Sequence, residues 1–398
     1  MAEHGDSTKI HVVFLHNKLR KRAEDRYLID VAIALKEAGH RVTIYTSEFD
    51  QSNCFDEVNN ISGCLNVCYS GWWLPSSFKF WRSIVMALKM IFFPPEPKPK
   101  VIILDVNTIA LYLFSLLSDV KTIYLTHFTS LHQAEYYTKF MKITPDLTNA
   151  MCLKRANEVI VQSEGLADIF RRSFPGVKRE LKILPPCVDT GLWKERIIDI
   201  SRIVPDIPKP NFLFVCFGPY KKRSNFKLVL DAFEDLLLIS AEKIKNNVHL
   251  VIGGHCSDSQ LEQKIYYNEL LEYTKDKPFA SQVTFLRQLP TVHKKTLIEE
   301  SIGVLIPCKH EIFPDTLLAV LSSGRPIVAT NTGFAKEVLR HRISGVLVEP
   351  TPQMFAAAMY KILTNPAIQV FLSDMGHDVF AKKFSNDIFS RKINGIVS

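Results

Sequence analysis

The sequence predicts an α/β protein made of two doubly wound domains that face a cleft. Short apolar segments alternate regularly with helical patterns along the chain, and a proline-rich linker divides this alternation into two series. Regular alternation of strands and helices is typical of parallel sheets with right-handed crossovers. The length of 398 residues also exceeds what one compact core usually holds.

The first series begins with the apolar segment 10–15, which predicts a buried parallel strand. Apolar residues at helical spacing predict a helix over 26–38 that ends at Gly39, and the next strand covers 41–45. Further strands are expected at 101–104, 121–125 and 158–161 and within 183–189, with helices at 108–118, 145–156 and 166–174.

Prolines 205, 208 and 210 mark the linker, and we place the domains at 1–203 and 204–398. The helices from about residue 354 cap the second domain and can cross back to the first. Ligands of such sheets bind beyond the carboxyl ends of the strands, so the loops that follow strands are where chemistry is expected. The second series has expected strands at 212–217, 248–252, 282–286, 303–306, 326–329 and 345–348, and helices at 226–240, 260–274, 292–300 and 315–322.

The composition is that of a folded globular protein, with 47% hydrophobic and 23% charged residues. A net charge of +8 favours anionic partners. Because the basic residues are scattered and form no long run, we expect a phosphorylated ligand or an anionic membrane surface and no nucleic acid.

The eight cysteines include no CxxC pair and no Cys/His spacing typical of zinc. We therefore expect reduced, mostly buried thiols in a cytosolic compartment and no metal site. Cys64 and Cys68 could lie close together, but two ligands do not make a metal site. The absence of GxGxxG after a first strand also argues against a dehydrogenase.

An aromatic segment at 72–93 is unusual for a globular domain. It concentrates Trp and Phe beside Lys79, Arg82 and Lys89, the pattern of an amphipathic helix in a membrane interface. An interdomain helix with an aromatic face is the alternative. The N-terminus has no signal-peptide pattern, and no apolar stretch reaches the ~20 residues that span a bilayer.

Several motifs in the loops resemble a known family. They are the stretches 16–26, 71–75, 126–128, 161–165 and 185–189, followed by 248–254, 283–287, 326–333 and 344–350. Over essentially the whole chain they resemble the family-four retaining glycosyltransferases, and among these the GDP-mannose-dependent α-1,3/α-1,6-mannosyltransferases of the dolichol pathway. The resemblance implies the GT-B fold, in which two Rossmann-like domains hold a sugar nucleotide between them.

The resemblance also implies particular site residues. His127 matches a family histidine near the transferred sugar, and Glu311 matches the glutamate that touches the sugar hydroxyls. Glu337 matches an acidic position near the donor. His127, at the end of a strand, is also compatible with a structural role. GDP-mannose is implied as the co-substrate, with no cofactor or metal, and a lipid-linked oligosaccharide as the acceptor.

The departures from the family pattern concern the donor diphosphate. Where the family has a Gly-Gly pair that lets backbone amides approach the phosphates, this chain has Arg22 and Ala23. Where the family has an Arg and a Lys, it has Pro219 and Ser224. Each lost charge-assisted contact costs about 1.5–3 kcal/mol.

Nearby cations are the candidates to replace these contacts. Lys222 and Arg223 lie beside the altered loop positions, and Arg22 brings charge to the first loop. A solvated run of charges is the alternative interpretation of 221–223. The family's second glutamate, which holds the ribose, corresponds to Ala319.

The leading hypothesis is a mannosyltransferase of lipid-linked oligosaccharide assembly on the cytosolic face of the endoplasmic reticulum membrane. A catalytically impaired homologue that acts as a scaffold or regulator is the first alternative. A glycosyltransferase that uses a different sugar nucleotide is the second.

Overall fold

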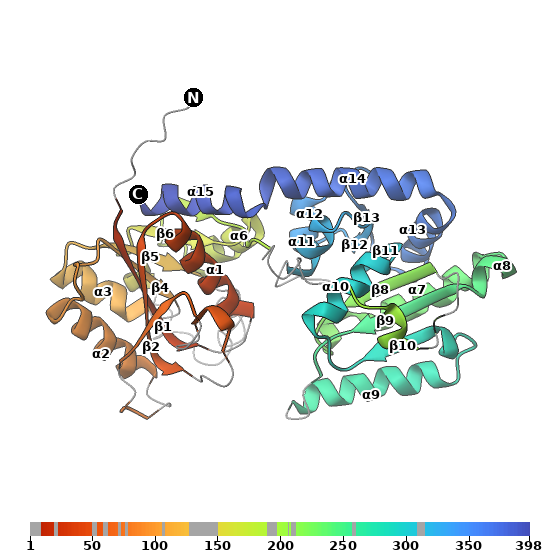
Figure 1. Ribbon diagram of the computed structural model, residues 1–398, viewed down its shortest axis with the longest axis horizontal. Coiled ribbons are helices and arrows are strands. Elements are labelled where there is room, and N and C mark those ends of the chain that lie inside the picture. The colour runs from red at the N-terminus through yellow and green to blue at the C-terminus, as the bar shows by residue number, and fades with distance from the viewer. Residues whose placement is uncertain are drawn as a thin grey trace. The chain divides into compact units, whose positions relative to one another are not determined.

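The structure is a computed structural model with two compact units (Figure 1). Unit 1 comprises Met1–Cys187 and Asn386–Ser398, and unit 2 comprises Val188–Ser385. The residues that the structure describes are 9–19, 23–49, 54–58, 63–70, 73–75, 79–105, 108–126, 150–188, 197–205, 207, 212–256, 260–308 and 315–398.

Unit 1 is built on a seven-stranded sheet in the order β3-β2-β1-β4-β5-β6-β7, in which every neighbouring pair is parallel. Its order reverses between β1 and β4, which makes this pair the topological switch point. The strands are β1 (His11–Leu19), β2 (Arg41–Phe49), β3 (Asn66–Tyr69), β4 (Val101–Asp105), β5 (Lys121–Leu125), β6 (Glu158–Val161) and β7 (Leu181–Ile183).

Helices cover both faces of this sheet. The crossovers through α1 (Ala23–Glu37) and α2 (Lys79–Phe92) run in opposite directions across the sheet, so right-handed crossovers place them on opposite faces. Helix α3 (Thr108–Leu117) packs beside α2, and α6 (Glu164–Ser173) connects β6 with β7. Gly39 follows the end of α1 by two residues, and its φ of 92° suits a residue without a side chain.

Unit 1 is completed by the last helix of the chain, α15 (Asn386–Val397), which lies beside α1 (Figure 1). Phe389 packs edge-on against Tyr27 of α1, with ring centroids 6.3 Å apart. Lys121 donates a hydrogen bond of 2.7 Å to the carbonyl of Ile396. Phe389 and Ile393 are buried in the same apolar core as the strands of unit 1.

Unit 2 has a six-stranded parallel sheet in the order β10-β9-β8-β11-β12-β13, with its switch point between β8 and β11. The strands are β8 (Phe212–Phe217), β9 (Val248–Gly253), β10 (Val283–Leu286), β11 (Gly303–Ile306), β12 (Ile327–Thr330) and β13 (Val346–Val348). The helices are α7 (Phe226–Ile239), α8 (Glu242–Lys245), α9 (Leu261–Lys275), α10 (Thr291–Glu300), α11 (Asp315–Ser322), α12 (Gly333–Val338), α13 (Pro352–Thr364) and α14 (Pro366–Lys383).

The predicted fold class is confirmed, because both units are Rossmann-like parallel α/β bodies. Two expected strands are too short, since β1 and β2 continue to Leu19 and Phe49. The short edge strand β3 and the single-turn helix α8 were not expected from the sequence.

Candidate functional site

The carboxyl edge of the unit 1 sheet holds a buried charged cluster at its switch point. His16 on β1 contacts Asp105, the last residue of β4, with 2.6 Å between Nδ1 and Oδ2. The other ring nitrogen, Nε2, lies 3.1 Å from a carboxylate oxygen of Asp25 on α1 and 2.7 Å from the carbonyl oxygen of Lys18. All three side chains of the cluster are buried, so the residues that join β1, β4 and α1 here are held by charge as well as by packing.

This arrangement keeps the His16 ring protonated. Burial by itself lowers the pKa of His16, but the attraction and hydrogen bond of Asp105, joined by those of Asp25, outweigh it and raise that pKa to about 10. The imidazolium therefore donates hydrogen bonds from both nitrogens at neutral pH. It serves as a fixed cation of the fold and not as a proton acceptor.

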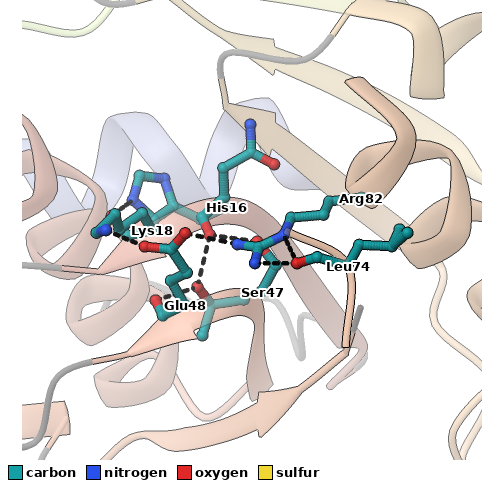
Figure 2. Close-up of polar contacts among 8 residues, drawn as sticks. His16, Lys18, Ser47, Glu48, Leu74 and Arg82 are labelled. Carbon is teal, nitrogen blue, oxygen red and sulfur yellow. Dashed lines mark hydrogen bonds and ion pairs between the residues drawn. The ribbon is translucent and has the colours of Figure 1, made fainter. Parts of the chain in front are cut away.

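A second cluster ties helix α2 to the same edge of the sheet (Figure 2). Arg82 on α2 donates a hydrogen bond of 2.6 Å to Glu48 on β2 and one of 2.8 Å to the carbonyl of Leu74. Lys18 of β1 contacts the other carboxylate oxygen of Glu48. Partial burial by itself raises the pKa of Glu48, but its bonds to Lys18 and Arg82 outweigh burial and lower that pKa.

Arg82 differs from what the aromatic segment led us to expect. The segment predicts that Arg82 lies with Lys79 and Lys89 beside a membrane-facing surface, but Arg82 is 6% exposed and points toward β2. The outward side of α2 instead carries Phe80, Trp81 and Phe92. Helix α2 therefore has a polar anchor on its inner side and aromatic rings on its outer side.

Three predicted site residues, Arg22, His127 and Glu311, lie outside the described residues. The residue before His127, Thr126, is described: its buried hydroxyl donates to the carbonyl of Ile160 at 2.8 Å. Of the other predicted residues, Lys222, Arg223 and Glu337 all belong to unit 2 and are exposed.

Hydrogen bonds within the loop and to the neighbouring strands β9 and β10 fix the loop that follows β8 of unit 2. The hydroxyl of Ser224 is buried and donates to the carbonyl of Pro219 at 2.6 Å. The hydroxyl of the buried Tyr220 lies 3.0 Å from the carbonyl oxygens of both Ile252 and Leu286, which share its one hydrogen. Positions 219 and 224, at which the resemblance implies diphosphate-binding cations, are thus bonded to each other, and neither brings charge.

The loops after β8 and β11 meet at the switch point of unit 2. Asn225, with a left-handed φ of 54°, donates from its side-chain amide to the carbonyl of Pro307 at 3.3 Å. Gly254 allows the loop after β9 to approach closely, because a Cβ at this position would lie 1.8 Å from the carbonyl oxygen of Gly218. The backbone loops are therefore in close contact at this edge, which is where ligands of doubly wound sheets bind.

Several cations lie in the loops or the first helical turn at the carboxyl edge of the unit 2 sheet. Lys222 and Arg223 lie in the short 3-10 turn Lys222–Ser224, and Arg287, after β10, lies 5.5 Å from the ring centroid of Tyr267. Lys294, in the first turn of α10, donates to the hydroxyl of Thr316 at 3.1 Å. We did not single out Arg287 and Lys294 from the sequence. Their positions, in the loop and the first helical turn that follow β10, were the available signal.

Glu337 lies on α12, the short helix that follows β12. Thr330 and Thr332, at the end of β12, both direct their hydroxyls to the carbonyl of Cys308 after β11. Ala319, where the family has its second glutamate, is buried in the unit 2 core. Glu337 is therefore the one acidic residue of the predicted set that the described part of this edge presents to solvent.

The described residues contain no group of three or more His, Cys, Asp and Glu side chains placed to hold a metal ion. Within the same part of the chain, none of the helices combines the length and the apolar character needed to cross a membrane.

Known families match both halves of the chain. Residues 25–192 match the family described as Glycosyltransferase Family 4, and residues 198–376 match Glycosyl transferases group 1. The chain is 27% identical to the α-1,3/1,6-mannosyltransferase ALG2 of Dictyostelium discoideum in an alignment 386 positions long that covers 91% of each chain. It is 27% identical to the mouse enzyme of the same name in an alignment 392 positions long that covers 94% of this chain and 92% of the relative.

Solved structures share the fold at low sequence identity. The sucrose-phosphate synthase of Thermosynechococcus elongatus superposes with a TM-score of 0.73 at 15% identity, over 98% of both chains. A glycosyltransferase of Rickettsia africae gives a TM-score of 0.74 at 14% identity, also over 98% of both chains. With a family 4 region followed by a group 1 region on two Rossmann-like units, the chain belongs to the GT-B glycosyltransferases.

Proposed function

We propose that this chain transfers mannose from GDP-mannose to a lipid-linked oligosaccharide, forming α-1,3 or α-1,6 linkages. The observation that carries the proposal is the similarity to α-1,3/1,6-mannosyltransferases along more than nine-tenths of both sequences. A similarity of this extent includes both units and the connection between them, so it is not a shared domain alone.

The carboxyl edge of unit 2 supports a donor that carries phosphate. Retaining transfer in this fold needs the acceptor in position and the departing diphosphate stabilised. The cations Lys222, Arg223, Arg287 and Lys294 lie in the loops or first helical turns that follow β8 and β10. We therefore assign the nucleotide sugar to this edge of unit 2, with Glu337 beside it.

One observation favours the alternative of a catalytically impaired homologue. The hydrogen bond between Ser224 and Pro219 fills the place where the family presents two cations. A loss of two charge-assisted contacts, at about 1.5–3 kcal/mol each, weakens donor binding by ~100-fold or more unless other cations replace them.

Donor binding and transfer separate these functions. Titration calorimetry of the full chain with GDP-mannose and with UDP-glucose should show binding of GDP-mannose only, and mannose should pass to a lipid-linked oligosaccharide acceptor. Glu311→Ala should abolish the transfer, because this position matches the residue that touches the sugar. Binding of UDP-glucose alone would indicate another donor. If neither nucleotide sugar binds, the alternative of a scaffold or regulator is favoured.

We further propose that helix α2 brings unit 1 to the cytosolic surface of the endoplasmic reticulum membrane, where a lipid-linked acceptor resides. The outer side of α2 and the segments beside it expose large aromatic rings, which suit the interface between lipid headgroups and acyl chains. These rings, with their exposed fractions, are Trp73 (63%), Phe80 (49%), Trp81 (55%), Phe92 (64%) and Phe93 (77%).

Replacing Phe80 and Trp81 by Ser should weaken the binding of the full chain to phosphatidylcholine vesicles that contain an anionic lipid by about 10-fold or more. Complete burial of such a ring contributes roughly 1.5–3 kcal/mol, and about half of each ring is exposed, so the two rings together contribute about 1.5–3 kcal/mol to vesicle binding. Cosedimentation with vesicles measures the change. The matched control replaces Leu238 and Leu261, which are 75% and 70% exposed in unit 2, and should leave binding unchanged. An equal loss in the control variant would contradict the assignment to α2.

A further inference from the structure

The switch point of unit 2 is flanked by the end of β8 and by the helix that follows β11. Phe217 is the last residue of β8, and Thr316 lies in the first turn of α11. In doubly wound sheets the ligand lies outside the carboxyl ends of the strands at this point. A residue that contacts both Phe217 and Thr316 therefore borders the place where a ligand of unit 2 binds.

Lys294 makes both of these contacts. It comes from a third element, α10, and its ammonium group donates to the hydroxyl of Thr316 at 3.1 Å. The same ammonium lies 5.8 Å from the ring centroid of Phe217. The ring attracts the cation, and it covers one side of it with apolar carbon, so the charge is less screened than that of a fully exposed lysine. Lys294 is itself half-buried.

The other cations of this edge are held differently. Lys222 and Arg223 are exposed, and Lys221 lies 3.6 Å from a carboxylate oxygen of Glu262. Arg287 lies against Tyr267, on the side of the β9 and β10 loops. Lys294 is fixed to the two elements that flank the switch point.

Two positions of the loop after β8, near the switch point of unit 2, carry no positive charge. Positions 219 and 224 carry proline and serine, which are hydrogen-bonded to each other and bring no charge to a diphosphate. An ammonium group is a point charge with three donors and suits phosphate oxygens that approach from variable directions. Lys294 has the charge, the partial burial and the position that such a ligand needs.

We propose that Lys294 binds the diphosphate of the donor nucleotide and replaces the cations that positions 219 and 224 lack. This inference rests on the proposed function only in that the donor is a nucleoside diphosphate sugar, whichever its base. Thr316 acts as the positioning residue, because its hydroxyl accepts the hydrogen bond that directs the ammonium group to the switch point.

The test compares GDP and guanosine binding to the full chain and to its Lys294→Met variant, by calorimetry for GDP and by NMR line broadening for guanosine. The substitution should weaken GDP binding about 10- to 100-fold, the size of one charge-assisted contact, and should leave guanosine binding unchanged. Lys294→Arg should retain most of the GDP affinity. Thr316→Val should give a smaller loss, again for GDP and not for guanosine. Lys361→Met, an exposed lysine in the last turn of α13, is the charge-matched control.

Each outcome decides between the two proposals. GDP binding that is unchanged in Lys294→Met overturns the role of Lys294 and leaves the proposed function intact. An equal loss for guanosine also overturns it, since the lysine then contacts the nucleoside. If the chain binds UDP and not GDP, the GDP-mannose donor is wrong, and the same comparison with UDP and uridine tests Lys294. If no nucleoside diphosphate binds, both proposals fall.

Discussion

Raising the pH from 6.5 to 8.5 should lower the free energy of unfolding of unit 1 by about 2–3 kcal/mol through His16 alone. The pKa of His16 is raised to about 10 in the folded chain, against an ordinary value of 6.5. The unfolded chain therefore loses this proton above pH 6.5 while the folded chain keeps it, and each pH unit costs about 1.4 kcal/mol. The stabilisation is complete below pH 6.5 and is lost as the pH approaches 10.

Urea unfolding followed by tryptophan fluorescence measures this effect, because three of the four tryptophans lie at positions 72, 73 and 81 of unit 1. His16→Gln should remove the slope between pH 6.5 and 8.5. His11, whose pKa burial lowers, acts below pH 6.5 and does not disturb the comparison. Asp105→Asn should destabilise unit 1 by roughly 3 kcal/mol, since it removes the main partner of a buried cation. A slope that is the same in wild type and His16→Gln would show that His16 is not protonated.

Arg82→Met should destabilise unit 1 by roughly 3 kcal/mol. The change removes a buried charge that bonds to Glu48 and to the carbonyl of Leu74, and it leaves that carbonyl without its arginine donor. The methionine retains most of the apolar stem, so the loss reports the polar anchor of α2. Urea unfolding at constant pH measures it.

Arg171→Met is the matched control for Arg82→Met. Arg171 also pairs with an aspartate, Asp168, at 2.9 Å, but the two side chains are 53% and 67% exposed. Solvent screening keeps such pairs within about 0–1 kcal/mol, so this variant should unfold like wild type. Similar losses in the two variants would mean that burial does not set the strength of the Arg82 anchor.

The helices and the buried strands were predictable because their apolar residues repeat at local spacing. Strand β3 was not, because it lies at the sheet edge with Asn66 and Tyr69 exposed, and its four residues form no apolar run. Its existence depends on the free backbone edge of β2, which is 17 or more residues away in sequence. Edge strands are made by their neighbour as much as by their own side chains.

That the loops after strands hold the site stays a prediction. His16 and Asp105 each follow directly on an apolar run, but the structure places both within strands, His16 inside β1 and Asp105 at the end of β4. The orientation of Arg82 depends on Glu48, which lies 34 residues earlier. A local sequence pattern does not predict a contact between residues that far apart. Lys294 and Lys295 look alike in the sequence, yet Lys294 contacts the end of β8 while Lys295 is buried, a difference that tertiary packing sets.

Helix α15 gives unit 1 a discontinuous chain. Residues 386–398 complete its core, and they follow the whole of unit 2 in sequence. On the ribosome, at about 5–20 residues per second, the first 187 residues therefore wait at least ten seconds or so for their last helix. Unit 2 is continuous and can fold during that interval. Unit 1 is thus the first unit to be synthesised and the last to have its complete chain.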